Sequence, residues 1–296
     1  TRAFEVLKIL YFVHKSVRSC DVVYLTVSES LAGNLKDLLI YLTCRKKIDK
    51  FYIQLHGGSI KRDVFERHPF LMRINKLALR KIAGVFISGD SHKHIYSSMI
   101  EDSKIHIVRN FAQDYLFLDE QSIRKKFMKI RPLKIVYISG MTPKKGYLNL
   151  LKAYQALDNN RRNFVEIDFA GKFDTVEEEE KFTQEIEIYP NLRYHGVVDN
   201  EDKRQMFATA HVFCLPTSFL EGQPISILEA YASGCVVLTT GQPGILDIFS
   251  DGINGYEISK NDQFSIKNLI EKKIIISDNL LDIALNNSRV ATSNYR

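Results

Sequence analysis

Short apolar runs of four to six residues recur along the chain, and each is followed by a turn and then by a longer amphipathic stretch. Runs that are apolar at consecutive positions are typical of strands buried on both faces, as in parallel sheets. Their alternation with helical patterns indicates repeated β-α-β units. The predicted strands are 21–25, 51–55, 84–87, 105–108, 134–139, 165–170, 212–215 and 235–238, and the predicted helices are 32–45, 70–81, 91–99, 147–157, 176–188, 199–209 and 224–233.

The chain has 296 residues, which at about 150 residues per domain suggests two domains. The charged stretch 116–131 ends at Pro132, directly before a strongly apolar run, and the strand–helix series resumes after it. This change in composition places a domain boundary near residue 125. We therefore predict an α/β protein with two doubly wound Rossmann-like domains, residues 1–125 and 126–296, which face each other across a cleft.

Charge is distributed unevenly between the two halves. The formal net charge of the chain is +6, but residues 1–130 carry +10 and residues 131–296 carry −4. A basic first half suits an anionic partner, such as a membrane surface or an anionic lipid-linked substrate. A basic surface that contacts only solvent is the plain alternative. The basic residues are scattered and no nucleic-acid-binding motif is found, so no nucleic-acid partner is expected.

Composition narrows the class of protein further. Hydrophobic residues make up 45% of the chain and charged residues 26%, which is typical of a folded protein and excludes disordered and collagen-like chains. No apolar run approaches the roughly 18 residues of a transmembrane helix, and the chain start lacks the features of a signal peptide. The four cysteines form no CxxC pair and no Cys/His cluster, which indicates a reducing compartment and no structural zinc.

Glycines and polar residues follow six of the predicted strands. In doubly wound sheets, ligands bind outside the carboxyl ends of the strands, where such residues leave room and offer polar contacts. Any one of them would be an ordinary loop residue, but their recurrence favours a binding site. The segments are His56-Gly57-Gly58, Ser88-Gly89, Arg109-Asn110, 140–146, Gly171-Lys172 and 216–224.

The segment 216–234 carries the most informative pattern. Gly222 allows a ligand to approach the backbone closely. Pro224 suits the first position of a helix, because it has no N–H to leave unpaired, and Gly234 suits the helix end. The free N–H groups at this helix start, together with the helix dipole, can bind a phosphate.

Glu229 is the charged residue of this predicted helix, and it falls at the edge of an apolar stripe formed by Ile225, Leu228 and Ala232. A carboxylate in that position needs a hydrogen-bonding partner when it is buried, and two ribose hydroxyls would serve. The alternative is a glutamate that lies in solvent on an amphipathic helix.

The segment resembles the signature of the family 4 retaining glycosyltransferases, which have the GT-B fold. The resemblance lies in Glu221 and Glu229, separated by seven residues within Glu-Gly-x-Pro-x-x-x-Leu-Glu-Ala-x-Ala-x-Gly. Other segments are similar to further motifs of that family, so the resemblance covers nearly the whole chain. They are 195–197, 241–248 and 251–255, together with Asn110.

The resemblance implies a role for each matching residue. A lysine at the diphosphate would stabilise the charge that develops as the glycosidic bond breaks. Without the resemblance, Lys145 would be an exposed turn lysine and His56 a structural loop histidine. The implied catalytic residues are His56 and Glu221, both near the transferred sugar, and the implied donor-binding residues are Lys145 at the diphosphate, Glu229 at the ribose, and Gly140, Gly222, Gln223 and Ile225.

The chain also departs from the family pattern. The family usually has an arginine five residues before its lysine, where this chain has Gly140, so Lys144 or Lys172 would have to replace one of two cations. The family's first strand with its glycine-rich loop, and its C-terminal crossover helix, have no counterpart in the sequence. We therefore expect a truncated first domain on the acceptor side and a donor-binding second domain.

These observations together predict a retaining glycosyltransferase that moves a sugar from a UDP- or GDP-sugar to a hydroxyl of a glycan or lipid-linked acceptor, in cell-surface polysaccharide or glycolipid biosynthesis. No metal ion or other cofactor is expected, because Lys145 and the helix start supply positive charge. The expected location is the cytoplasm, with peripheral attachment to the inner face of the membrane. The alternatives are another GT-B enzyme, such as a sugar-nucleotide epimerase or a phosphorylase, and a non-catalytic nucleotide-sugar-binding or partner subunit.

Overall fold

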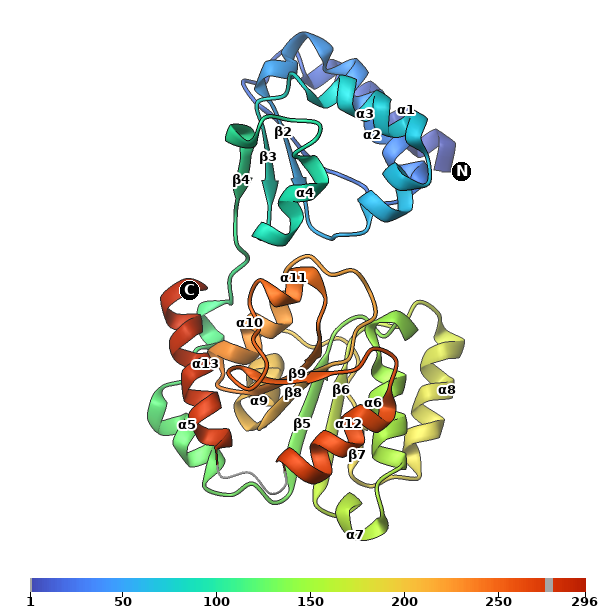
Figure 1. The fold of residues 1–296 in the computed structure, drawn as a ribbon. Coiled ribbons are helices and arrows are strands. Elements are labelled where there is room, and N and C mark those ends of the chain that lie inside the picture. Colours follow the sequence, from blue (N-terminus) through green and yellow to red (C-terminus); the bar gives the residue numbers. More distant parts are fainter. Residues whose placement is uncertain (1, 275–278) are drawn as a thin grey trace. The chain divides into compact units, whose positions relative to one another are not determined.

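Two units, each built on its own parallel β-sheet, make up the chain (Figure 1). The computed structural model describes residues 2–274 and 279–296. Parallel strands separated by helices confirm the predicted α/β class. Unit 1 contains Thr1–Arg109, Leu220–Gln223 and Pro243–Ile248, and unit 2 contains Asn110–Phe219, Pro224–Gln242 and Phe249–Arg296.

The sheet of unit 1 has four strands in the order β1-β2-β3-β4, and every neighbouring pair is parallel. Parallel pairing brings all four carboxyl ends to one edge of the sheet. The strands are β1 (Val23–Thr26), β2 (Phe51–Leu55), β3 (Gly84–Ile87) and β4 (Ile105–Ile107), and the helices are α1 (Arg2–Ser16), α2 (Leu31–Thr43), α3 (Pro69–Leu79) and α4 (Lys93–Tyr96).

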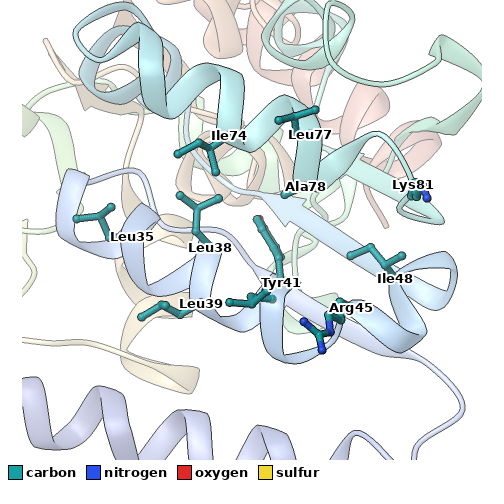
Figure 2. A pocket seen from close by; sticks show the side chains of 11 residues that line it. Leu35, Leu38, Leu39, Tyr41, Arg45, Ile48, Ile74, Leu77, Ala78 and Lys81 are labelled. Carbon is teal, nitrogen blue, oxygen red and sulfur yellow. The ribbon is translucent and has the colours of Figure 1, made fainter.

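In the core of unit 1, the alternate residues Phe51, Ile53 and Leu55 of β2 are buried on one face of the sheet, and the residues between them are partly buried on the other. A buried pair of amides links two of the covering helices. Asn34 Nδ2 of α2 donates to Asn75 Oδ1 of α3 over 3.1 Å, and Asn75 Nδ2 donates back to Asn34 Oδ1 over 2.9 Å. An apolar groove of about 730 Å³ lies between the same two helices (Figure 2).

The sheet of unit 2 has six parallel strands in the order β10-β9-β8-β5-β6-β7. Strands β5, β6 and β7 run outward in one direction, and the chain then returns to place β8 on the other side of β5. This reversal is a topological switch point, the place where ligands bind in doubly wound sheets. The strands are β5 (Leu133–Ile138), β6 (Val165–Ala170), β7 (Leu192–Tyr194), β8 (Val212–Leu215), β9 (Val236–Thr240) and β10 (Gly255–Ile258).

Strands β8 and β9 are buried at every position, as the continuous apolar runs predicted. Within residues 2–274 and 279–296, no helix has the length and apolar composition needed to cross a membrane. The remaining helices are α5 (Glu120–Phe127), α6 (Tyr147–Gln155), α7 (Asn159–Arg162), α8 (Val176–Glu187), α9 (Asn200–Thr209), α10 (Ile225–Ala232), α11 (Pro243–Leu246, within unit 1), α12 (Gln263–Leu269) and α13 (Leu280–Asn294).

Residues 110–125 belong to unit 2, whereas the sequence analysis drew the boundary after them. Backbone contacts explain the difference. The N–H of Leu118 donates to the carbonyl of Ala232 over 3.1 Å, and the Ser233 hydroxyl donates to the carbonyl of Leu116 over 2.8 Å. The charged composition of this stretch conceals the buried Leu116, which anchors it to α10.

Eight helices and strands of the described residues were not predicted from the sequence: β7, β10, α1, α5, α7, α11, α12 and α13. Strand β7 has three residues, of which only Leu192 is buried, and β10 begins at Gly255 with a φ of +150°. Helix α1 leaves apolar residues such as Phe4 and Leu7 exposed, so no clear amphipathic stripe marks it. Short edge strands and helices with mixed faces carry weak periodic signals.

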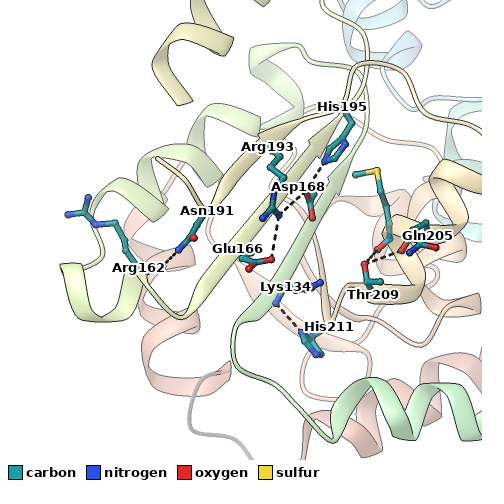
Figure 3. Close-up of polar contacts among 11 residues, drawn as sticks. Lys134, Arg162, Glu166, Asp168, Asn191, Arg193, His195, Gln205, Thr209 and His211 are labelled. Carbon is teal, nitrogen blue, oxygen red and sulfur yellow. Dashed lines mark hydrogen bonds and ion pairs between the residues drawn. The ribbon is translucent and has the colours of Figure 1, made fainter. Parts of the chain in front are cut away.

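His211, directly before β8, connects two strands of unit 2. Its Nδ1 accepts the N–H of Lys134 over 3.0 Å (Figure 3), and its Nε2 lies 3.1 Å from the carbonyl of Lys126, to which it donates. The contact at Nδ1 requires the neutral imidazole, because a protonated Nδ1 cannot accept, and burial lowers the pKa of His211 to about 4.

We expect acidification to destabilise unit 2 through His211. Between the ordinary histidine pKa and about 4, the unfolded chain binds the proton and the folded chain does not, so the free energy of unfolding falls as the pH falls from about 6.5 to about 4. The loss attributable to this group is about 3 kcal/mol. Denaturant unfolding at several pH values should show a flatter profile for His211→Gln, and an unchanged profile for the exposed control His94→Gln. Parallel profiles for wild type and His211→Gln would refute the assignment.

Candidate functional site

The loops after β5 and β8 contact each other at the switch point of unit 2. The N–H of Ser218 donates to the carbonyl of Lys144 over 2.8 Å, and the Thr217 hydroxyl approaches the same carbonyl at 3.4 Å. Lys145 Nζ lies 5.1 Å from the centre of the Phe219 ring, which is a cation–π contact. The two loops therefore hold the Lys145 ammonium group at the carboxyl ends of β5 and β8.

Gly146 makes this approach of the two loops possible. Its φ is +87°, and a Cβ added there would lie 2.1 Å from the carbonyl oxygen of Pro216. Only glycine combines that backbone conformation with so close a contact. The Gly146 position thus fixes the turn that presents Lys145.

Gly140 lies in the same loop, and the space into which a side chain would extend from it is empty. Its carbonyl accepts the Tyr137 hydroxyl over 3.0 Å and the N–H of Thr142 over 2.9 Å, so the turn is closed by backbone atoms. A Cβ at this glycine would meet no atom within 4 Å, and its φ is not in the left-handed region. Gly140 brings no positive charge, but the structure has room for one.

The resemblance implies that Lys145 binds the donor diphosphate. On that role, we expect Gly140→Arg to strengthen binding of UDP or GDP by about 3–10-fold, because a second cation beside Lys145 would add a charge-assisted contact. Calorimetric titration measures the change. The uncharged Gly140→Gln separates charge from bulk and should leave the Kd near the wild-type value. Equal or weaker binding by the arginine variant would show that this loop does not face the diphosphate.

The carboxyl ends of β6 and β7 lie at the same edge of the sheet of unit 2 as those of β5 and β8. The N–H of Gly171 donates to the carbonyl of Gly196 over 2.7 Å, and the N–H of Ser139 donates to the carbonyl of Ala170 over 3.1 Å. His195, at the end of β7, lies with Nε2 2.7 Å from Asp168 Oδ1 of β6 (Figure 3). The strand end that the resemblance assigns to the nucleotide base therefore lies at this edge of the sheet.

Glu229 lies on α10 and is 4% exposed. Its Oε1 forms an ion pair with Lys203 Nζ of α9 over 2.9 Å. The interpretation of Glu229 as a solvated surface residue is therefore wrong, and the partner Lys203 was missed. Sequence reasoning had a signal for it, because an isolated buried carboxylate needs a cationic partner.

Two details of α10 differ from the expectation. Pro224 is the residue before the helix rather than its first residue, and no side chain caps this helix start. Ile225 is 49% exposed and does not belong to the apolar stripe, whereas Ile227, Leu228 and Tyr231 are fully buried. The helix is buried on all sides after its first turn, so its exposed part is the N-terminal end at Ile225.

The resemblance implies that Glu229 binds the donor ribose. On that role, Glu229→Gln is expected to weaken UDP or GDP binding by about 10–100-fold, because a hydrogen bond to a charged group contributes about 1.5–3 kcal/mol. Calorimetry with the matching 2′,3′-dideoxynucleotide supplies the control. Wild type should lose a similar factor with that analogue, and the variant should bind both nucleotides alike. If the variant still prefers the ribonucleotide by the wild-type factor, Glu229 does not bind the ribose.

The remaining predicted residues lie in unit 1. His56 follows β2, and a Cβ at Gly222 would lie 1.7 Å from the His56 carbonyl oxygen, so only glycine allows this contact. The N–H of Gly58 donates to the carbonyl of Leu220 over 3.3 Å. Glu221 is 6% exposed, and Gln223 is also buried.

His92 was not predicted and lies beside these residues. It is 3% exposed, and a Cβ at Gly58 would lie 2.9 Å from its Nε2 and 3.3 Å from the Glu221 carbonyl oxygen. Burial lowers the pKa of His92, although Asp247 and the Glu221 backbone favour its charged form. The sequence held a signal for it, since His92 follows Ser88-Gly89 at a strand end.

The eight predicted site residues therefore fall into two groups. Within the described residues, no three His, Cys, Asp or Glu side chains come close enough to hold a metal ion. Unit 1 holds His56, Glu221, Gly222 and Gln223, and unit 2 holds Gly140, Lys145, Ile225 and Glu229.

A family model described as glycosyl transferases group 1 matches residues 119–288, which is more than half of the chain. The chain belongs to this family. Among relatives, a poly(glycerol-phosphate) alpha-glucosyltransferase of Bacillus subtilis is 28% identical over 46% of this chain and 19% of the relative. A capsular polysaccharide biosynthesis glycosyltransferase, CapH of Staphylococcus aureus, is 25% identical over 74% of this chain and 62% of the relative. The chain thus spans less than two thirds of the length of the curated relatives it matches.

Solved structures agree on the fold. Anabaena Alr3699/HepE, crystallised with UDP-glucose, superposes with a TM-score of 0.72 at 16% identity, over 98% of this chain and 78% of that one. This glycosyltransferase-family chain therefore has the two Rossmann-like units of the predicted GT-B fold. The missing first strand and crossover helix stay predictions.

Proposed function

We propose that this protein is a retaining glycosyltransferase of family 4 type that uses a nucleotide diphosphate sugar. The observation that carries the proposal is the contact between the β5 and β8 loops, which holds Lys145 at the switch point of the second sheet. Nucleotides bind at such switch points in doubly wound folds. The names of relatives support the donor class, because one is an alpha-glucosyltransferase and Alr3699/HepE was crystallised with UDP-glucose.

The site residues have complementary roles in this reaction. Lys145 and the exposed start of α10 would neutralise the diphosphate as the bond to the anomeric carbon breaks. Glu229, oriented by Lys203, would bind the ribose. The acceptor hydroxyl would attack from the face that the diphosphate leaves, and its proton would pass to a leaving-group oxygen. Binding geometry would then set the retained configuration, without a strong base or a metal ion.

Glu221 and His56 would act at the transferred sugar. The Glu221 carboxylate would stabilise positive charge that develops on the sugar ring. For the acceptor, we propose a hydroxyl of a cell-surface glycan or lipid-linked glycan, a class that the capsular polysaccharide name of one relative supports. A cytoplasmic location at the inner face of the membrane would suit that acceptor.

A donor screen with the full-length protein tests the proposal. UDP- and GDP-sugars are supplied with polyprenyl-linked and soluble glycan acceptors, and NMR of the product reports the anomeric configuration. We expect transfer from one nucleotide class with retained configuration. Inverted product would contradict the retaining mechanism, and isomerised free nucleotide sugar without an acceptor would favour an epimerase.

A non-catalytic nucleotide-sugar-binding subunit is the second candidate, and Gly140 favours it because one expected cation is missing. The two candidates differ in one measurement. A binding subunit would show nucleotide affinity that depends on Glu229 but no transfer, with or without Gly140→Arg. Transfer by the wild-type chain would exclude it.

A further inference from the structure

A chain of hydrogen bonds within unit 1 ends at the Glu221 backbone. Directly after α11, the Asp247 carboxylate accepts the Ser91 hydroxyl at Oδ2 over 2.6 Å and the Ser91 N–H at Oδ1 over 3.1 Å. Ser91 Oγ in turn lies 3.1 Å from His92 Nδ1. The Nε2 side of the same ring meets the Glu221 carbonyl, to which the ring is hydrogen-bonded. These four residues come from three separate segments of the chain, and all of them belong to unit 1.

Gly89 allows the turn after β3 to close around the Asp247 carboxylate. A Cβ at Gly89 would lie 2.0 Å from Asp247 Oδ2, so a larger residue would push the two segments apart. At the other end of the chain of hydrogen bonds, His92 and Glu221 are buried. Because a buried polar group without a hydrogen bond is costly, we expect every contact in this chain to contain a hydrogen atom.

The hydrogen atoms available to the chain of hydrogen bonds can be counted. The Ser91 hydroxyl has one, and at 2.6 Å it goes to the Asp247 carboxylate, which only accepts. His92 Nδ1 must then donate to Ser91 Oγ, while Nε2 must donate to the Glu221 carbonyl, which also only accepts. An imidazole that donates from both nitrogens is protonated. With neutral His92, one of these three contacts is lost.

The groups that face His92 act on its proton in opposite directions. Burial is the largest effect and lowers the pKa of His92, and His94 of α4 adds to it. The Asp247 and Glu29 carboxylates and the Glu221 carbonyl favour the charged form instead. The further charged groups around the pocket of about 310 Å³ that His92 lines are Lys61, Arg62, Glu66 and the Glu221 carboxylate. Since burial prevails, His92 binds its proton below the ordinary histidine pKa and releases it as the pH rises through its own.

We propose that His92 positions Glu221, and that it does so as an imidazolium held between the Glu221 carbonyl and the Ser91–Asp247 pair. His92 fixes the backbone that carries the Glu221 carboxylate and does not itself contact the sugar. When the ring loses a proton, the contact at Nδ1 or at Nε2 is broken, and the Glu221 backbone loses its anchor. The effect on sugar transfer rests on the proposed function, whereas the protonation of His92 does not.

NMR of the full chain without substrate tests the protonation. Sequential assignment from the backbone identifies the His92 ring signals. Both ring nitrogens should become protonated as the pH falls from about 8 to about 5, with a midpoint below about 6.5. The Glu221 carbonyl carbon should shift with the same midpoint, because it accepts from the ring. A His92 ring that stays neutral at pH 5, or a Glu221 carbonyl signal that does not follow it, would overturn the proposal.

Asp247→Asn separates this arrangement from a simple packing contact. An asparagine amide can donate to Ser91 Oγ, so the Ser91 hydroxyl can donate to His92 Nδ1, and the neutral ring then satisfies every contact. The His92 midpoint should therefore fall by about one pH unit or more. The control Asp90→Asn removes an exposed carboxylate from the same turn, and should titrate like wild type. A wild-type midpoint in Asp247→Asn would show that Asp247 does not hold the proton on His92.

Kinetics test the positioning of Glu221. Ser91→Ala breaks the chain of hydrogen bonds and keeps the backbone N–H contact with Asp247, so kcat should fall by about 3–10-fold while the Kd of UDP or GDP stays near the wild-type value. Wild-type kcat should fall as the pH rises through the NMR midpoint of His92, and this fall should be absent from Asp247→Asn over the same pH range.

The outcomes distinguish the two proposals. A merely structural role would lower kcat and thermal stability together in Ser91→Ala, with the pH profile of wild type. Wild-type kcat in Ser91→Ala at every pH would show that His92 does not position Glu221. If no donor supports transfer at all, the proposed function fails, and the NMR titrations still decide whether protonated His92 holds the Glu221 backbone.

Discussion

Lys145→Met is expected to lower kcat/KM for sugar transfer by about 10²–10³-fold, the usual cost of removing one preorganised group that stabilises transition-state charge. Methionine keeps the aliphatic part of the side chain and removes the ammonium group with its cation–π contact to the Phe219 ring. The hydrogen bond from the Ser218 N–H to the Lys144 carbonyl does not involve this side chain, so the β5 and β8 loops should stay in place. The loss should lie mainly in kcat, because the departing diphosphate carries more negative charge in the transition state than in the bound donor. Steady-state kinetics with the best donor measure it.

Substitutions of two further lysines serve as comparisons for this experiment. Lys144→Met removes a charge from the same turn, but the backbone carbonyl of Lys144, rather than its ammonium group, makes the loop contact. Its kinetics show whether Lys144 replaces the missing arginine. Lys152→Met on α6 changes an exposed lysine and should alter the rate by less than about two-fold. If kcat/KM falls further in Lys144→Met than in Lys145→Met, Lys144 rather than Lys145 stabilises the departing diphosphate.

Glu221→Gln is the second substitution with a large expected effect. Glutamine keeps the shape of this buried side chain and removes its charge, so we expect kcat to fall by about 10²-fold while the Kd of UDP or GDP changes little. A merely structural role would instead lower thermal stability and nucleotide affinity together. The exposed Glu101→Gln serves as the control. If Glu221→Gln keeps the wild-type kcat, Glu221 takes no part in the reaction.

The sequence predicted the α/β class because buried parallel strands leave the clearest periodic signal. All eight predicted strands are present, and the central β8 and β9 match within two residues at their ends. The edge strands β7 and β10 were missed, since only part of each is buried. The boundary was displaced because charged residues on the surface of 116–131 concealed the few buried anchors that tie this stretch to α10.

For the candidate site, glycines and strand ends were the informative residues. In unit 1, Gly222 contacts the backbone that follows β2, and in unit 2 the 140–146 loop follows β5, so each lies at the carboxyl end of a strand of its own sheet. Partners far apart in sequence could not be found in this way. Lys203 meets Glu229 through the packing of α9 against the sheet, and His92 meets the Glu221 backbone through a contact that spans more than 120 residues.

A crystal structure of the protein with UDP or GDP tests the central claim most directly. The account predicts the diphosphate in contact with Lys145 Nζ and the first N–H groups of α10, the ribose hydroxyls on Glu229, and the base at the β7 end near His195. A nucleotide bound elsewhere, with Lys145 and Glu229 both out of contact, would contradict it.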